Sequence, residues 1–230
     1  MSRVTLIVVV EGQSESGFLK PFLAEHLALR GIDLHVPVIG SGSAKGGMKF
    51  RSFTQVCDEL HDFLADRRQP YVTTFLDYYG LPTGTRLGWD FIGPTKASHG
   101  VAGIEARLAD GVRSAAGRLA ERFIPYVQLH EFEALYYADP PLLARVLEAS
   151  EAVAERFAQE RHDAGGCEQI NDSQHTAPSK RIERLCPQYI KGRSTRAHAP
   201  RLGAQLDLTT VRAACPRFAA WLTRLESLAA

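Results

Sequence analysis

The fold is decided by RVTLIVVVEG at residues 3–12, an aliphatic, β-branched run that ends in an acid and a glycine. An uninterrupted apolar strand is typical of the centre of a parallel sheet, where both faces are covered. Glu11 stands where this strand gives way to a turn. The pattern predicts a buried first strand of an α/β domain with Glu11 at its carboxyl end.

Strand-like and helix-like segments alternate from this strand as far as Tyr137. The expected strands are 3–10, 32–39, 71–76 and 124–129, and the expected helices are 14–31, 50–67, 101–123 and 130–137. This alternation predicts a mostly parallel sheet with helices on both faces. After Asp139 only helices are expected, at 140–161, 177–185 and 209–228. The sequence therefore predicts an α/β core at 1–138 and a helical C-terminal region at 139–230, packed on the core.

Composition narrows the class of protein. No apolar run approaches the roughly 18 residues of a transmembrane helix, and residues 4–10 lack the length and cleavage site of a signal peptide. A cytoplasmic protein without membrane contact is expected. The cysteines are too widely spaced for a CxxC zinc or redox motif, which favours reduced, structural thiols. They are Cys57, Cys167, Cys186 and Cys215.

Charge is distributed unevenly. The net charge is +1, but residues 178–217 hold nine Lys or Arg against Glu183 and Asp207, a local balance of +7. The remainder of the chain therefore carries −6, from +1 minus +7. Such asymmetry fits a basic binding face beside an acidic, metal-binding core, and it equally fits a solvated helical surface.

Acids follow three of the four predicted strands. Glu11 ends the first, Asp77 the third, and Glu131 and Glu133 come after the fourth. Ligands of open parallel sheets bind beyond the carboxyl ends of the strands, so Glu11, Asp77 and one of the two glutamates are expected at one edge. Carboxylates held together need a hard cation such as Mg²⁺ or Mn²⁺, which could activate water for phosphodiester hydrolysis. Each acid alone could instead form a turn or cap a helix.

One glycine-rich loop is a weaker candidate for binding phosphate. GSAKGGMK at 42–49 resembles a phosphate loop, but Met48 stands where that motif needs lysine. The loop also follows the second strand rather than the first. Lys45 is retained as a candidate phosphate contact, together with Gly12.

Four motifs together resemble a known family. The stretch VVVEGQSE at 8–15 is similar to the first motif of Toprim domains, the topoisomerase–primase fold. With three further motifs it resembles a bacterial Toprim-like family catalogued as a domain of unknown function. These are DYYGLP at 77–82, HEFEAL at 130–135, and IND at 170–172 followed by TAPSKRI at 176–182.

The resemblance implies a Rossmann-like Toprim core with a metal-dependent phosphoryl-transfer site. Glu11 matches the Toprim glutamate that acts as general acid or base or as a metal-site carboxylate, and Asp77 matches the first acid of the Asp-x-Asp that binds Mg²⁺. Tyr79 replaces the second acid of that pair. Glu133, with Glu131 in second place, could fill the gap, as acids there do in Toprim nucleases of the overcoming-lysogenization-defect type.

The motif at 170–182 suggests phosphate contacts. Asn171, Ser179, Lys180 and Arg181 lie in or beside a predicted helix start, where backbone N–H groups favour anions. The alternative is that Thr176 and Ser179 cap the helix while the two cations face solvent.

The resulting hypothesis is a Mg²⁺- or Mn²⁺-dependent nuclease acting on DNA or RNA. Glu11, Asp77, Glu133 and Lys180 would be catalytic. The resemblance also implies an ABC-type ATPase partner in phage defence. The sequence does not determine whether the chain forms a homo-oligomer. A non-catalytic Toprim scaffold that binds a partner, and a small-molecule phosphotransferase, are the alternatives.

Overall fold

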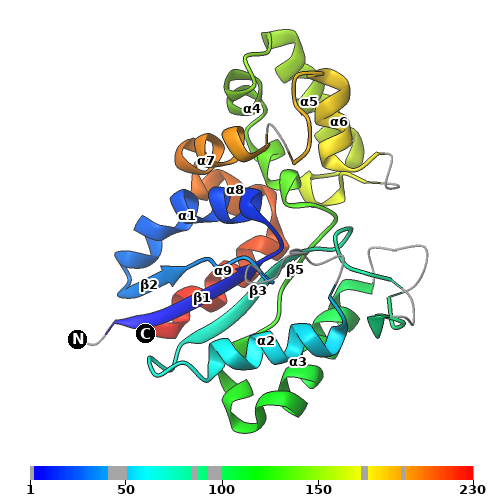
Figure 1. Cartoon of the computed structure of the whole chain (residues 1–230). Coiled ribbons are helices and arrows are strands. Elements are labelled where there is room, and N and C mark those ends of the chain that lie inside the picture. Colours follow the sequence, from blue (N-terminus) through cyan, green and yellow to red (C-terminus); the bar gives the residue numbers. More distant parts are fainter. Residues whose placement is uncertain are drawn as a thin grey trace. The chain divides into compact units, whose positions relative to one another are not determined.

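The computed structural model describes residues 3–40, 51–83, 87–92, 100–171, 176–192 and 195–229 (Figure 1). Across these ranges no helix combines the length and the apolar character that a membrane crossing requires. The four cysteines are buried free thiols.

The sheet is parallel and places the first strand at its centre (Figure 1). Strand β1 (Val4–Val10) lies between β2 (Ile32–His35) and β3 (Tyr71–Asp77). On its other side β3 pairs with β4 (Phe123–Ile124) and β5 (Val127–Gln128), and all these pairings are parallel. Residues 6–10 of β1 are buried, as its sequence predicts for an interior strand whose side chains point to two covered faces of the sheet.

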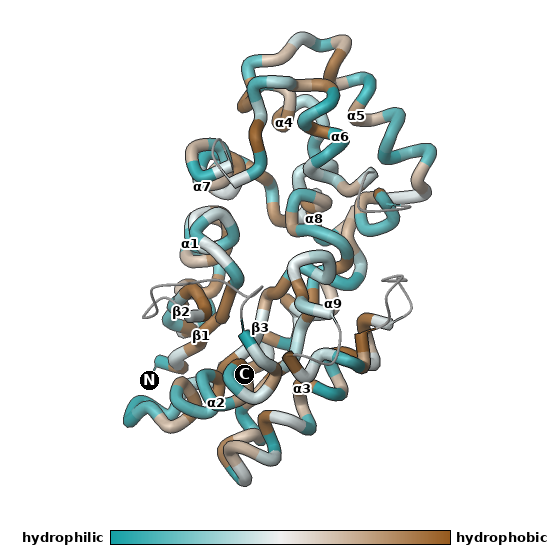
Figure 2. The backbone as a smooth tube through the Cα atoms, turned by 45° about the vertical axis from the view of Figure 1, so that its right-hand side comes forward, coloured by the Kyte–Doolittle hydropathy of each residue, from teal (hydrophilic) through white to brown (hydrophobic). Residues whose placement is uncertain are grey.

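Two amphipathic helices belong with this sheet. Helix α2 (Phe53–Leu64) begins with a capping box, in which Ser52 Oγ accepts from the Gln55 N–H at 3.2 Å and Gln55 Oε1 accepts from the Ser52 N–H at 2.9 Å. It packs against α3 (Val101–Ala116) on the same side of the sheet. Figure 2 shows that hydrophobic residues concentrate along β1.

The remaining elements are helical, and an aromatic cluster joins several of them. The Phe18 ring of α1 lies 5.3 Å from Tyr136 and 5.9 Å from Phe132, between centroids, and the Phe22 ring lies 5.8 Å from Phe218. These elements are α1 (Gln13–Ala28), η5 (Phe132–Ala138), α4 (Pro140–Val146), α5 (Glu151–Ala164), η6 (Cys167–Gln169), α6 (Pro178–Leu185), α7 (Thr195–Gln205), α8 (Leu208–Ala214), α9 (Pro216–Glu226) and η7 (Ser227–Ala229).

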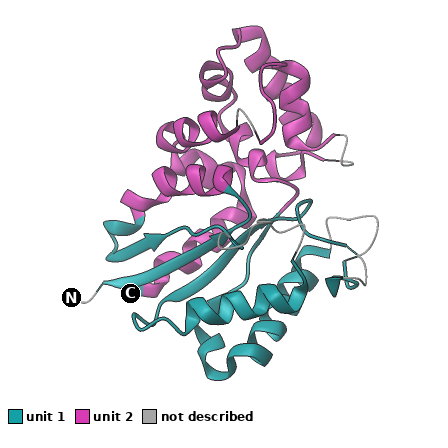
Figure 3. Ribbon diagram, viewed as in Figure 1, with its two compact units in different colours: residues 1–12, 27–128, 229 teal, residues 13–26, 129–228, 230 magenta. Residues whose placement is uncertain are grey.

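The chain forms two compact units (Figure 3). Unit 1 comprises residues 1–12, 27–128 and 229, and unit 2 comprises residues 13–26, 129–228 and 230. They differ from the expected parts 1–138 and 139–230 at two places. The aromatic cluster explains both, because Phe18 and Phe22 tie α1 to η5 and α9, which are therefore grouped together.

The α/β fold class, with a mostly parallel sheet and a helical C-terminal region, is confirmed. The prediction of two long helices is wrong, however, because each of them is divided into two shorter helices. The helix expected at 140–161 is broken where Glu148 adopts a left-handed φ of 57° and ends α4. The helix expected at 209–228 is broken at Pro216, which lacks an N–H and so begins α9.

Several other helices and strands have bounds that differ from those expected from the sequence. The strand expected at 32–39 ends at His35 and returns only as a bridge between Val10 and Val38. The strand expected at 124–129 is split into β4 and β5 around Pro125. The helix expected at 101–123 ends at Ala116, before Gly117 with a φ of 55°, and continues as the 3-10 helix η4 (Gly117–Arg122). Helix α7 was missed, because its Pro200 and Gly203 weaken the helical signal.

Candidate functional site

Two of the predicted acids lie at the carboxyl ends of neighbouring strands in unit 1. Glu11 directly follows β1 and Asp77 ends β3, and these strands are in parallel register with Val10 opposite Phe75. Asp77 is only 3% exposed. The chain then turns sharply, since the Gly80 N–H donates to the Asp77 carbonyl at 2.9 Å. The two acids therefore occupy one edge of the sheet, as the strand pattern predicts.

The Glu11 carboxylate is directed at this turn. A β-carbon added to Gly80 would overlap the Glu11 carboxylate, lying 2.6 Å from both Cδ and Oε1. Only glycine leaves room for the carboxylate here, so Gly80 allows Glu11 to reach over the turn that begins at Asp77. This close approach is direct evidence that the side chain of Glu11 lies beside the backbone that follows Asp77.

The other two predicted acids belong to a buried cluster in unit 2. Glu133 is fully buried, and its carboxylate accepts from Tyr189 Oη at 3.1 Å. The carboxylate of Glu131 accepts from the backbone N–H of Ser179 at 2.9 Å. Lys191 Nζ lies 2.8 Å from Glu131 Oε1 and 3.5 Å from Glu133 Oε2, so its ammonium joins the two acids.

Burial raises the pKa of the Glu133 carboxyl to about 7. The positive charge of Lys191 opposes this shift, while the negative charges of Glu131 and Glu15 add to it. Burial, followed by the charge of Glu133, also raises the pKa of Tyr189 well above its usual range. Tyr189 therefore remains a hydrogen-bond donor to Glu133 at neutral pH.

Glu133→Gln is expected to remove a pH dependence of stability. The pKa of about 7 in the folded state exceeds the ordinary 4.5, so between these values the folded chain binds more protons than the unfolded chain. The wild-type free energy of unfolding should therefore fall as the pH rises through this window. Urea titrations at pH 5 and pH 8 should show this fall in the wild type and in the exposed-site control Glu155→Gln. An equal fall in Glu133→Gln would contradict the assignment.

The predicted phosphate contacts have varied surroundings. Lys180 is exposed and its Nζ pairs with Glu183 Oε2 at 2.6 Å. Arg181 Nε donates to the Thr176 carbonyl at 2.8 Å, and Asn171 Nδ2 lies 3.2 Å from His130 Nδ1. At the start of α6 the Ser179 N–H donates a hydrogen bond to the Glu131 carboxylate. These residues share unit 2 with the Glu131–Glu133 cluster, and their phosphate contacts stay predictions.

Two further candidates complete the sequence-based set. Gly12 is a partly exposed bend residue next to Glu11. Lys45 lies outside the described residues. The aromatic residues Tyr78 and Trp89 are buried at 2% and 0% exposure, so their rings pack inside the protein and are not available to stack on nucleic-acid bases.

Sequence reasoning missed Lys191, Tyr189 and Glu15. Lys191 is one of nine cations in a basic stretch, and no local pattern distinguishes it from the others. Glu15 offered a signal, since it lies in the first turn of α1, four residues after Glu11. Its influence on the pKa of Glu133 places its charge near the cluster in unit 2.

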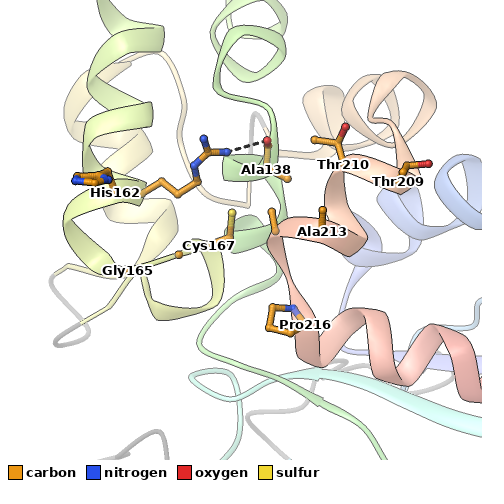
Figure 4. Close-up of a pocket in the computed structure, with 11 residues that line it drawn as sticks. Ala138, His162, Gly165, Cys167, Thr209, Thr210, Ala213 and Pro216 are labelled. Atoms are coloured by element: carbon orange, nitrogen blue, oxygen red, sulfur yellow. Dashed lines mark hydrogen bonds between the residues drawn. The ribbon is translucent and has the colours of Figure 1, made fainter.

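A cavity of about 980 Å³ also lies in unit 2, lined by residues of α5, η6 and α8 (Figure 4). Its one arginine, Arg161, donates from Nη1 to the carbonyls of Tyr137 at 3.1 Å and Ala138 at 3.0 Å. No carboxylate is among its described lining residues. The cavity therefore lacks the oxygen ligands that a Mg²⁺ site needs.

Within the described ranges no three His, Cys, Asp or Glu side chains are grouped so as to hold a metal ion. The pair Glu11 and Asp77 nevertheless fits a Mg²⁺ ion in its donor chemistry. Mg²⁺ commonly binds through one or two carboxylates and completes its shell with water and substrate phosphates. These two residues are the ones that could hold the ion in unit 1.

The chain is an α/β protein in which Glu11 and Asp77 stand at the carboxyl ends of adjacent parallel strands. The chain belongs to the family described as Domain of unknown function (DUF4276), whose model matches residues 10–226. No protein with curated annotation matches the sequence significantly.

One solved structure is similar to the chain. It is the C-terminal region of the Burkholderia pseudomallei OLD protein, with 17% sequence identity and a TM-score of 0.47. The match covers 100% of each chain. A similarity at this level defines no shared activity.

Proposed function

We propose that the protein is a divalent-metal-dependent nuclease that hydrolyses phosphodiesters of DNA or RNA. The observation that carries the proposal is the placement of Glu11 and Asp77 at the ends of adjacent parallel strands, with the Glu11 carboxylate seated over Gly80. The Toprim resemblance of residues 8–15 and 77–82 supports it. Glu11 and Asp77 would hold Mg²⁺ or Mn²⁺.

The roles of the two acids follow from their positions. The bound ion would supply Lewis-acid stabilisation of the charge on the phosphate and lower the pKa of a water molecule. Asp77, which is almost completely buried, would fix the ion relative to the sheet. Glu11 is more accessible, so it could also accept a proton from the attacking water. Because Gly80 has no side chain, it would leave the space that the Glu11 carboxylate occupies in this position.

We also propose roles for the other residues that the sequence analysis singled out. Glu131, Glu133, Asn171, Ser179, Lys180 and Arg181 are the remaining site residues of the proposed nuclease, and Gly12 and Lys45 its loop contacts. The Toprim resemblance supports a role in phage defence with an ABC-type ATPase partner, and a cytoplasmic location is part of the same proposal. Nucleic acid is the expected substrate.

The alternative is a non-catalytic subunit that uses the same scaffold to bind a partner. Two observations favour it. Tyr79 stands where the Toprim pattern has a second acid, and no three potential ligands are grouped within the described ranges.

A cleavage assay separates these functions. The purified protein is incubated with supercoiled plasmid, single-stranded DNA and total RNA, each with Mg²⁺, with Mn²⁺ and with EDTA. The nuclease should cleave at least one substrate with metal and none with EDTA. Metal-independent cleavage, or no cleavage by a protein that binds no divalent ion, would contradict the proposal, and the second result would favour the binding subunit.

A further inference from the structure

The Glu131–Glu133 cluster holds a cation that belongs to the chain itself. Lys191 Nζ is 2.8 Å from Glu131 Oε1 and 3.5 Å from Glu133 Oε2. The backbone at this residue is also anchored, since the Lys191 N–H donates to Glu183 Oε1 at 2.9 Å. The ammonium therefore lies between the two carboxylates, where an ion bridging them would have to bind.

The remaining oxygens of both carboxylates are occupied as well. Glu131 Oε2 accepts from the Ser179 N–H at 2.9 Å, and Glu133 Oε1 accepts from Tyr189 Oη at 3.1 Å. All four carboxylate oxygens thus have a donor from the protein. A metal ion could use them only by displacing these donors, and a displaced buried donor loses its partner.

The donor to Glu133 is itself held in one direction. The Gly192 N–H donates to Thr195 Oγ1 at 3.2 Å, and Thr195 Oγ1 donates to Tyr189 Oη at 3.2 Å. This leaves the Tyr189 hydroxyl hydrogen to point at Glu133. The chain of bonds favours the cluster as it stands, because each bond polarises the next.

Charge and space also disfavour a second ion. Two carboxylates and one ammonium leave at most one negative charge, and a divalent ion would be repelled by the ammonium at close range. Mg²⁺ also keeps several of its water molecules when bound to proteins. Glu133 is 0% exposed, so a hydrated ion cannot reach its carboxylate without opening the cluster.

We propose that Lys191 takes the place of a second divalent ion between Glu131 and Glu133, so that the protein binds a single ion through Glu11 and Asp77. This inference rests on the proposed function, because that function supplies the one bound ion. It also changes the role of the predicted metal ligands. Glu131 and Glu133 hold Lys191 instead of coordinating metal.

Counting bound Mn²⁺ tests the inference without measuring activity. Free Mn²⁺ is determined by electron paramagnetic resonance during titration of the intact protein. The wild type should bind one ion per chain, as should Glu131→Gln and Glu133→Gln, whereas Asp77→Asn should bind none. Lys191→Met should raise the count toward two, because it leaves two carboxylates without their cation. Lys20→Met, which replaces an exposed lysine of α1, is the matched control and should stay at one.

The possible ion counts test the single-ion inference separately from the proposed nuclease function. Two ions in the wild type, loss of the ion in Glu131→Gln or Glu133→Gln, or a folded Lys191→Met that still binds one ion would overturn the inference and leave the nuclease proposal standing. A wild type that binds no ion would contradict both. Circular dichroism establishes whether Lys191→Met is folded, and if it is not, the two glutamine variants decide.

Discussion

Asp77→Asn is expected to lower the rate of metal-dependent cleavage by about 100-fold or more, which corresponds to roughly 3 kcal/mol of transition-state stabilisation. The substitution keeps the shape of the side chain and removes the charge that attracts a hard cation. Asp77 is 3% exposed at the end of β3, and its substitution leaves only Glu11 of the two proposed ligands. The rate is measured on whichever nucleic acid the wild type cleaves, at saturating Mg²⁺ and at saturating Mn²⁺.

A matched control comes from the same sheet. Asp33 lies on β2 with its side chain 58% exposed, so Asp33→Asn removes one charge from unit 1 without touching the predicted ion site. Its cleavage rate should stay within about twofold of the wild type, since surface substitutions away from specific contacts have small effects. Equal activity of Asp77→Asn and Asp33→Asn would show that Asp77 does not hold the ion.

The sequence was sufficient to place Glu11 and Asp77 at the carboxyl ends of their strands. Residues 4–10 form a β-branched, almost wholly apolar run that predicts a buried strand, and Glu11 follows it directly. Asp77 is placed by the same logic at the end of β3. Parallel strands then bring both acids to one edge, whatever their distance along the chain. The prediction succeeded because it needed only strand pattern and strand direction.

The Glu131–Glu133 cluster of unit 2 depends instead on contacts between distant segments. Lys191 meets Glu131 and Glu133 across 60 and 58 residues of chain, and Tyr189 meets Glu133 across 56. No periodicity within a helix or strand encodes such a meeting. The basic stretch that contains Lys191 was therefore visible as charge, while the one lysine that neutralises buried acids was not distinguishable from Lys180.

Helix breaks illustrate the same limit at a smaller scale. Pro216 could have been read as the start of a new helix, because proline is favoured in the first helical turn. The break at Glu148 had no such signal, since glutamate is a good helix former and takes a left-handed φ of 57° only within the folded chain. Local propensity could predict the first break and not the second.

Gly80→Ala is expected to reduce cleavage by about 100-fold, because a displacement of roughly 1 Å in a positioned group can cost that much. The new β-carbon would lie 2.6 Å from Glu11 Cδ, so the carboxylate must move away from the turn after Asp77. The overlap is with the end of a flexible side chain, so the free energy of unfolding should change by less than about 1 kcal/mol. Urea unfolding and cleavage rates, measured together, should separate the two effects.

Gly103→Ala in α3 is the control, since a β-carbon there has no neighbour within 4 Å and should leave the cleavage rate unchanged. The decisive comparison is the double variant. If Gly80→Ala acts by displacing the Glu11 carboxylate, it should lose most of its effect in a Glu11→Gln background, because the two substitutions disable one group. Additive losses would mean that Gly80 acts through something other than Glu11, and the arrangement proposed for the ion site would be wrong.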